Sequence, residues 1–465
     1  MKHRLPMLTA LLLIVMANVA NSQNLVPIKE VDNTIVQPIN WTRFKKKIPH
    51  DDLANTVKAT LLNVNKFALG AWYRDLKKYQ TDSTGYLDLK SKSKVNEYRY
   101  RFPAGMAFGL AIAIKTGIYD PKVTGQSLQE AQEKAVLMIK SVAYDHKINA
   151  TRSVWGGDWQ AAHWAYYAGY GAWLLWEDFA PKDQSNIIRM IVAEADRFLP
   201  TKPLYYKDST GKVIFKGDSK IEENAWNAEL LYLAAEMMPK HAHAGKWLYK
   251  AAEYLIAATA LPSDLKNSKI IHGRPVSSWV EGYNVEEPGF VINHGIIHPT
   301  YNALASMINA PIVFSLVGKP TPEAARFNLD KIYYSVTSYR FSSPPYKAPG
   351  GTMYQVGSPE VYYPEGSDWG LGVYDTYANL DIAAFTYGWD DKALNHKGKY
   401  WAKLHTDKVW AQQQRFADGH TYTGDDENSY PGREEAIATR MASAWMTMWL
   451  QKQVPAVYDN KPIEQ

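Results

Sequence analysis

The periodicity of apolar residues is the feature that most constrains the fold of this chain. Apolar side chains recur at spacings of three and four in about a dozen segments, a pattern typical of amphipathic or buried helices. Because no sustained two-residue alternation competes with this pattern, we expect an all-α protein. The predicted helices cover residues 52–79, 100–117, 126–149, 158–178, 182–199, 223–238, 241–260, 298–317, 322–340, 372–388, 392–413 and 433–451.

The order of these segments predicts an α/α toroid. About six sequential helical hairpins, joined by alternating short and long connections, would form an inner and an outer ring of helices. Minor β-hairpins are expected only near residues 204–217 and 351–366. Long connections in a compact domain often carry function, and here they cover residues 200–222, 261–297, 341–371 and 414–432.

The first residues resemble a cleaved export signal. Lys2 and Arg4 precede an apolar stretch, and small residues follow it before position 23. We therefore expect a signal peptide over residues 1–22, a single toroidal catalytic domain over 23–465, and a periplasmic or secreted location. No later apolar run is long enough to predict a membrane span. The chain has no cysteine, so its stability must come from a large core and not from disulfides.

Charge and aromatic content point to a sugar-binding protein. The formal net charge is +5 for the whole chain, and +3 without Lys2 and Arg4, which argues against a nucleic-acid partner. The sequence holds 16 Trp and 31 Tyr against 13 Phe. Trp and Tyr combine a flat apolar face with a polar edge, which suits sugar rings. Large helical cores also use many aromatic residues, so only clusters beside polar loop residues favour the sugar-binding interpretation.

The stretch "INHGIIHPTYNAL" gives the strongest candidate for catalysis. Pro299 predicts the first turn of a helix and makes His298 its expected N-cap. Asn293 and His294 then lie in the loop just before the helix, and Tyr301 lies on its first turn. Two imidazoles, a phenol and an amide within about one turn can serve proton transfer. The alternative is a well-capped helix start.

Two further stretches predict residues that bind substrate. Trp155 and Trp159 flank a Gly-Gly pair and suggest a wall for sugar stacking, or else a part of the core. Asn224 and Asn227 lie one turn apart at a helix start, where their amides would project from one face. N-terminal capping is the alternative explanation for these two residues.

The stretch "YYPEGSDWG" offers aromatic and acidic candidates. Tyr363 and Trp369 are expected to bind substrate. Glu365 and Asp368 form a carboxylate pair of the type that glycoside hydrolases use. A helix cap and a solvated loop charge are the alternative roles for the two acids.

The loop "DGHTYTGDDENSYPGREEA" contains a cluster of carboxylates. Asp425, Asp426 and Glu427 hint at a Ca²⁺ site, although their spacing is not that of an EF-hand. No other metal or cofactor is expected. Arg433, at the next helix start, is a candidate anchor for an anion, or an exposed helix arginine.

These motifs together resemble the helical-toroid polysaccharide lyases, several families of which carry an Asn-His pair followed by a catalytic Tyr. Within that group we expect a resemblance to polysaccharide lyase family 27, which removes rhamnose from glucuronic acid. The resemblance implies that Asn293 and His294, helped by Asn227, neutralise the uronate carboxylate. The tandem "NNH" usual in that group is "INH" here, with Ile292 in the first position.

We therefore expect a polysaccharide lyase that cleaves an acidic oligo- or polysaccharide by β-elimination. His294, His298 and Tyr301 would act on the proton, and Asn293 would act on the carboxylate. Two alternatives remain open. One is a glycoside hydrolase on the same toroid, with Glu365 and Asp368, or Glu223, as its acid and base. The other is a glycan-binding protein without catalysis.

Overall fold

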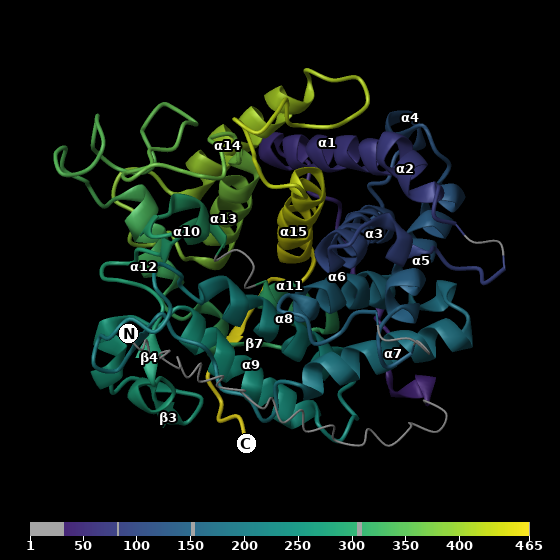
Figure 1. The fold of residues 1–465 in the computed structure, drawn as a ribbon, viewed down its shortest axis with the longest axis horizontal. Coiled ribbons are helices and arrows are strands. Elements are labelled where there is room, and N and C mark those ends of the chain that lie inside the picture. The colour runs from purple at the N-terminus through teal and green to yellow at the C-terminus, as the bar shows by residue number, and fades with distance from the viewer. Residues whose placement is uncertain (1–31, 81–82, 150–153, 305–308, 465) are drawn as a thin grey trace, which may run out of the picture. The chain divides into compact units, whose positions relative to one another are not determined.

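Helices dominate the computed structural model, which describes residues 32–80, 83–149, 154–304 and 309–464. The prediction of an all-α class is confirmed. Residues 1–22, the expected signal peptide, and residues 305–308 of one expected helix lie outside the described residues. The helices with at least eight residues are α1 (Asp52–Phe67), α3 (Phe102–Lys115), α5 (Leu128–Tyr144), α6 (Ala161–Leu174), α7 (Pro181–Asp196), α8 (Ile221–Met237), α9 (Ala244–Ala258), α11 (Ala310–Val317), α12 (Leu329–Thr337), α13 (Tyr374–Tyr387), α14 (Gly398–Gln413) and α15 (Arg433–Gln453) (Figure 1).

Two kinds of helix alternate along the chain. Helices α3, α6, α8, α13 and α15 are buried on nearly all sides. Helices α1, α5, α7, α9 and α12 bury one face and expose the other. A helix that is buried all round must be covered by neighbours on every side. The amphipathic helices provide that cover.

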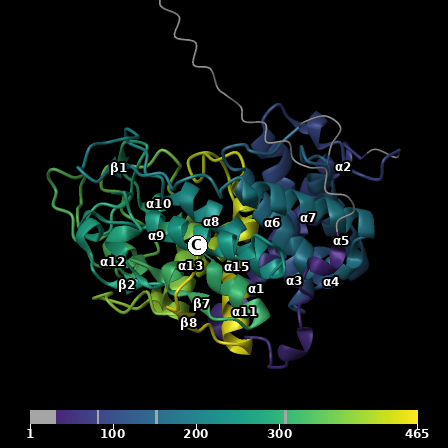
Figure 2. The same cartoon turned by 90° about the horizontal axis from the view of Figure 1, so that it is seen from below.

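The fully buried helices pack against one another in a consistent order. Helix α3 contacts α6 and α15, α6 contacts α8, and α15 contacts α13. Figure 1 shows α15 between α13 and α3. In Figure 2, α12 and α5 lie at opposite sides of these helices, with α8, α13 and α15 between them. The amphipathic helices pack on the outside, α5 on α3, α9 on α8 and α14 on α13.

Local sequence explains several helix starts. Asp51 accepts a hydrogen bond from the Ala54 backbone N–H at 3.0 Å and caps α1. Ser127 and Glu130 form a capping box at the start of α5. A capping side chain satisfies backbone donors that would otherwise lack a partner in the first turn. These caps fix the ends of helices whose length the apolar pattern already predicts.

One expected helix, over residues 322–340, is interrupted in the structure. A short 3-10 turn over Glu323–Arg326 is followed by α12, and Asn328 between them has a left-handed backbone, with φ of 56°. The Asn328 amide donates to the Thr259 carbonyl at 3.0 Å and to Asp264 at 2.6 Å. These contacts with a distant segment favour the break over a continuous helix. The expected helix over 298–317 is described only as α10 (Pro299–Ala303) and α11.

The strands are short and occur in pairs. Strand β1 (Lys207–Asp208) pairs with β4 (Gly282–Tyr283), β2 (Ile270–Ile271) with β3 (Arg274–Pro275), β5 (Ile292–Asn293) with β6 (Ile296–Ile297), and β7 (Thr321–Pro322) with β8 (Tyr458–Asp459). The hairpin expected over 204–217 is reduced to one bridge, between Lys207 and Val213. Strand β1 instead pairs with β4, which comes from the next long connection.

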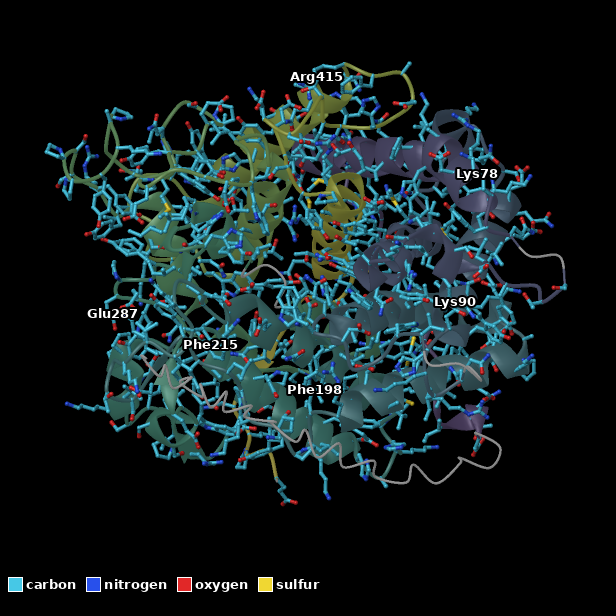
Figure 3. All side chains as sticks on the ribbon, viewed as in Figure 1. Lys78, Lys90, Phe198, Phe215, Glu287 and Arg415 are labelled. Carbon is cyan, nitrogen blue, oxygen red and sulfur yellow. The ribbon has the colours of Figure 1, made fainter. Side chains whose placement is uncertain are left out.

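Within the described residues, no helix combines the length and the apolar character that crossing a membrane requires. Side chains fill the space between the helices, as Figure 3 shows.

A buried acid joins α7 to the loop before α6. Glu194 accepts hydrogen bonds from His146 at 3.0 Å and from the Gly157 backbone N–H at 2.7 Å, and it pairs with Arg197. Burial opposes ionisation of Glu194, but the His146 hydrogen bond and the Arg197 charge outweigh it and lower the pKa to about 2. The charged form of Glu194 therefore stabilises the folded protein.

We predict that Glu194→Gln lowers the free energy of unfolding at pH 7 by about 3 kcal/mol. An acid whose folded pKa is depressed contributes stability above its unfolded pKa, and this contribution is lost as the pH falls through the folded value. The difference in free energy of unfolding between wild type and variant should therefore fall to zero as the pH decreases from about 4.5 to about 2. Denaturant unfolding across that range tests this, with the exposed Glu133→Gln as control. A gap that stays constant with pH would contradict the assignment.

Candidate functional site

Four long connections meet at the candidate site. The Gly295 backbone N–H donates to the Gly217 carbonyl at 2.9 Å, which joins residues 200–222 to 261–297. His294 contacts Asp368 in the third connection. The Ser429 hydroxyl, in the fourth, donates to the Asp368 carbonyl at 3.0 Å. These hydrogen bonds bring the four long connections together.

A tight hairpin presents His294. Strands β5 and β6 are joined by His294 and Gly295, which both have positive φ, of 51° and 80°. Two-residue hairpin turns with positive φ at both positions match the twist of the strands. Glycine adopts this backbone freely, whereas a histidine there is uncommon and is often found at functional sites. The turn also needs glycine at position 217, where a Cβ would come within 2.8 Å of the Gly295 backbone.

His294, Tyr301 and Asp368 form a chain of hydrogen bonds. His294 Nδ1 lies 2.6 Å from Asp368 Oδ2, and the Tyr301 hydroxyl lies 3.2 Å from His294 Nε2. A carboxylate only accepts, so Nδ1 of His294 carries the proton and donates it. In the neutral ring Nε2 is then the acceptor for the Tyr301 O–H. An acid, an imidazole and a hydroxyl in this order are the arrangement by which a base activates a nucleophile or a second base.

His298 holds Asp368 from the other side. Its Nε2 donates to Asp368 Oδ1 at 3.0 Å, and the ring is fully buried at the N-cap of α10. Burial lowers the pKa of His298 to about 4, so it is neutral at neutral pH. Burial opposes ionisation of Asp368, but hydrogen bonds from His298 and His294 lower its pKa. His298 therefore positions the carboxylate and is not open to substrate.

Tyr301 is a protonated phenol. Its side chain is 5% exposed, and burial raises its pKa, with nearby acidic groups, the charge of Asp218 among them, acting in the same direction. A phenol in this state donates its proton readily only when an acceptor is close. His294 Nε2 is that acceptor.

Aromatic rings form one wall of the site. The ring of Trp369 lies 5.0 Å from Tyr301 and 5.9 Å from His294, measured between centroids. Tyr430 stacks on Trp369 at 6.2 Å. Trp369 is only half-buried, so a sugar ring can stack beside the imidazole.

Asn293, to which the resemblance assigns the uronate carboxylate, is engaged within the hairpin. Its side chain is 1% exposed. The amide Nδ2 donates to the Ser219 carbonyl at 3.2 Å, and Oδ1 accepts from the His294 backbone N–H at 2.8 Å. Both ends of the amide are therefore used in holding the hairpin, and a side chain buried in this way is not presented to a substrate carboxylate.

Three of the expected binding residues are held by other parts of the protein. Trp155 is 2% exposed and donates to the Val142 carbonyl, so it belongs to the core. Asn224 is buried and bonds the backbone N–H and C=O of Leu204. Tyr363 is buried, and its hydroxyl lies 2.8 Å from that of Tyr377. Packing and backbone contacts account for these three side chains.

Three more of the expected binding residues keep some exposure. Trp159 is 59% exposed and donates to Glu223 at 2.6 Å. Asn227 is half-buried on α8, and its Oδ1 has no hydrogen-bond partner among the described residues. Arg433 donates to Asp425 at 3.0 Å and to the Asn428 carbonyl at 2.7 Å. Trp159 and Asn227 remain candidates for substrate contacts, and Arg433 is engaged within its own loop.

The carboxylates of the expected Ca²⁺ site have separate partners. Asp425 pairs with Arg433, and Glu427 pairs with Arg415, which Figure 3 labels at the upper edge of the view. Ca²⁺ binding at this loop stays a prediction. Elsewhere, ligand atoms of His294, His298 and Asp368 lie within 4.8 Å of one another and could hold a metal ion. Hydrogen bonds to Asp368 already satisfy the facing nitrogens of both histidines.

Sequence reasoning missed several charged residues near the site. Glu222, whose pKa is raised well above its usual range by burial, and Asp218 both act on Tyr301. Arg101 lies over the ring of Tyr430, with its carbon Cζ 5.4 Å from the ring centroid. Arg101 lies within the helix predicted over residues 100–117, but nothing in the local pattern relates it to Tyr301 or Tyr430, far along the chain.

Comparisons with models of protein families, with curated proteins and with solved structures found no match for this chain.

We predict that Asn293→Ala lowers the free energy of unfolding by about 1–3 kcal/mol, because the Ser219 carbonyl loses its buried donor. Urea denaturation measures this. Asn227→Ala is the matched control, since the Oδ1 of that amide has no partner among the described residues, and it should change stability less. Equal stability of Asn293→Ala and wild type would contradict the structural role of this amide.

Proposed function

We propose that this protein is a polysaccharide lyase that cleaves a uronic-acid-containing glycan by β-elimination. The observation that supports the proposal is the hydrogen-bond chain from Asp368 through His294 to Tyr301, beside the half-buried ring of Trp369. Family 27, which releases rhamnose from glucuronic acid, remains the specific form that we propose. We also propose export to the periplasm or the medium, through the signal-like residues 1–22.

The proposed architecture is an α/α toroid. Helices α3, α6, α8, α13 and α15 would form most of the inner ring, completed by α10. The preceding helix of each hairpin, α1, α5, α7, α9, α12 and α14, would lie outside. The alternation of fully buried and amphipathic helices supports this arrangement, as do the contacts of consecutive buried helices.

The proposed reaction moves one proton and breaks one C–O bond. The Tyr301 oxygen takes the proton from C5, next to the uronate carboxylate, while the Tyr301 proton passes to Nε2 of His294. Asp368 stabilises the imidazolium that forms. The electron pair left at C5 forms the C4=C5 double bond, and the bond from C4 to the leaving oxygen breaks. Tyr301 gives the proton to that oxygen, and His294 returns its proton to Tyr301.

A second candidate function is glycoside hydrolysis. Hydrolases need one protonated and one ionised carboxyl group. Burial raises the pKa of Glu222 well above its usual range, which gives a neutral acid near Tyr301. Glu223, considered from the sequence, instead accepts hydrogen bonds from Trp159 and Lys220. Glu222 is therefore the residue that would carry a hydrolytic mechanism.

We predict that the protein, given uronate-containing glycans, forms an unsaturated uronate that absorbs at about 235 nm. Tyr301→Phe and His294→Ala should each reduce the rate by at least about a hundredfold, because they remove the proton-transfer groups. Tyr334→Phe and His396→Ala are matched controls, since these residues lie on α12 and before α14 and outside the hydrogen-bond chain.

Other outcomes separate the alternatives. New reducing ends without this absorbance, lost in Glu222→Gln, would show hydrolysis in place of elimination. Binding of glycans without any product would show a glycan-binding protein. Near wild-type rates in both Tyr301→Phe and His294→Ala would contradict the proposed mechanism.

A further inference from the structure

A narrow polar cavity lies among the fully buried helices. It has a volume of about 20 Å³, which is room for about one water molecule. Residues from α6, α8, α13 and α15 line it, together with Arg101, which directly precedes α3. The lining consists of Arg101, Tyr167, Glu229, Asn309, Asn379, Ala436, Thr439, Arg440 and Ser443.

Two guanidinium groups in this cavity have donors to spare. Arg101 donates through Nη1 to Glu97 at 2.8 Å and to Gln160 at 3.0 Å. Arg440 donates through Nη1 to Asp375 at 2.8 Å. All three of these hydrogen bonds use Nη1. Within the described residues, Nε and Nη2 of both arginines are left to bind a ligand. Both side chains keep some exposure, 14% for Arg101 and 13% for Arg440.

The cavity itself supplies no negative charge to these arginines. Glu97 and Asp375, their partners, are not part of the lining. Glu229 does line the cavity, but burial raises its pKa well above the usual range, so its carboxyl group is neutral there. Burial and the charges of Arg101 and Arg440 lower the pKa of His163, so this neighbour is neutral as well. An anion that enters the cavity therefore meets the guanidinium groups and no carboxylate.

A further polar atom in the lining lacks a partner. The side chain of Asn379 is 3% exposed, and its Oδ1 has no hydrogen bond within the described residues. Leaving a buried polar atom unpaired costs about 1–3 kcal/mol. A ligand with a hydroxyl group beside its charge can satisfy this oxygen.

The cavity is connected to the hydrogen-bond chain of Tyr301 by an aromatic wall. Arg101 lies over Tyr430, Tyr430 stacks on Trp369, and Trp369 lies 5.0 Å from Tyr301. The charge of Arg101 also acts on Tyr301, where it favours the ionised phenol. Arg101 thus contacts the first ring of this wall, and Tyr301 lies at its other end.

We propose that Arg101 and Arg440 form the carboxylate subsite of this protein, and that it binds the free carboxylate of a hexuronate. This inference rests on the proposed function for its role in catalysis, where charge neutralisation next to C5 is required. It assigns to the two arginines the role that the resemblance implied for Asn293. The guanidinium fork matches a carboxylate with two parallel hydrogen bonds.

The size of the cavity defines the substrate class further. A volume of about 20 Å³ lets one oxygen of a carboxylate take the place of a water molecule, but it is too small for a sugar ring, which must stay outside the cavity. A uronate methyl ester has no charge to offer the arginines. The subsite therefore selects free uronates over their esters and over neutral hexoses.

The experiment is a thermal-shift titration of the full-length protein with glucuronate, with glucose and sodium chloride as probes at matched ionic strength. We expect stabilisation by glucuronate alone. The variant Arg440→Met/Asp375→Asn removes one arginine together with its partner, which avoids leaving a buried carboxylate unpaired. In this variant the glucuronate concentration for half of the shift should rise by at least about tenfold. Arg326→Met removes an arginine that pairs with Glu323 outside the cavity. This control should leave the glucuronate concentration for half of the shift unchanged.

The outcomes separate this inference from the proposed function. Equal shifts with glucose or chloride, or an unchanged titration in the double variant, would overturn the subsite. If the double variant does not fold, Arg101→Lys, which keeps the charge but loses the fork, must still weaken glucuronate binding. Selective glucuronate binding without any unsaturated product would leave the subsite standing and refute the lyase. Elimination with an unchanged KM in the double variant would support the lyase and refute the subsite.

Discussion

The candidate site depends on the carboxylate of Asp368. It accepts one hydrogen bond from His294 and one from His298, residues that come from a different long connection. The first bond fixes the tautomer of His294, and the second gives the buried ring of His298 its partner. Without Asp368, the histidine on the strained hairpin turn would keep its backbone but lose its orientation. Tyr301 would then face an imidazole with no defined acceptor.

The interior of the helical unit is more polar than folding alone requires. Arg101, Arg440 and Glu229 lie among helices that are buried on nearly all sides. Burying charged groups costs free energy even when they are paired, and natural sequences break this rule mainly at functional sites. The substrate binding that we propose would account for this polar cavity, which stability alone does not require.

The helices could be predicted because their signal is local. A three- and four-residue spacing is present within each segment, and all but two of the expected helices appear close to their predicted bounds. The closeness of His294, His298 and Tyr301 was also predictable, since seven residues separate the first from the last. The break at Asn328 was not, because it depends on contacts with Thr259 and Asp264. Tertiary contacts of this kind leave no periodic trace.

The roles of single residues were harder to predict than their closeness. Asn293 looked available, but the Ser219 carbonyl, 74 positions earlier in the chain, uses its amide. Asp368 looked like half of a hydrolase pair, and in the structure it accepts hydrogen bonds from two histidines. The most direct test is the tautomer of the neutral His294 ring, measured by nitrogen NMR of the folded protein. The account predicts a proton on Nδ1 and a free lone pair on Nε2. A proton on Nε2 would contradict it, since Tyr301 would then have no acceptor.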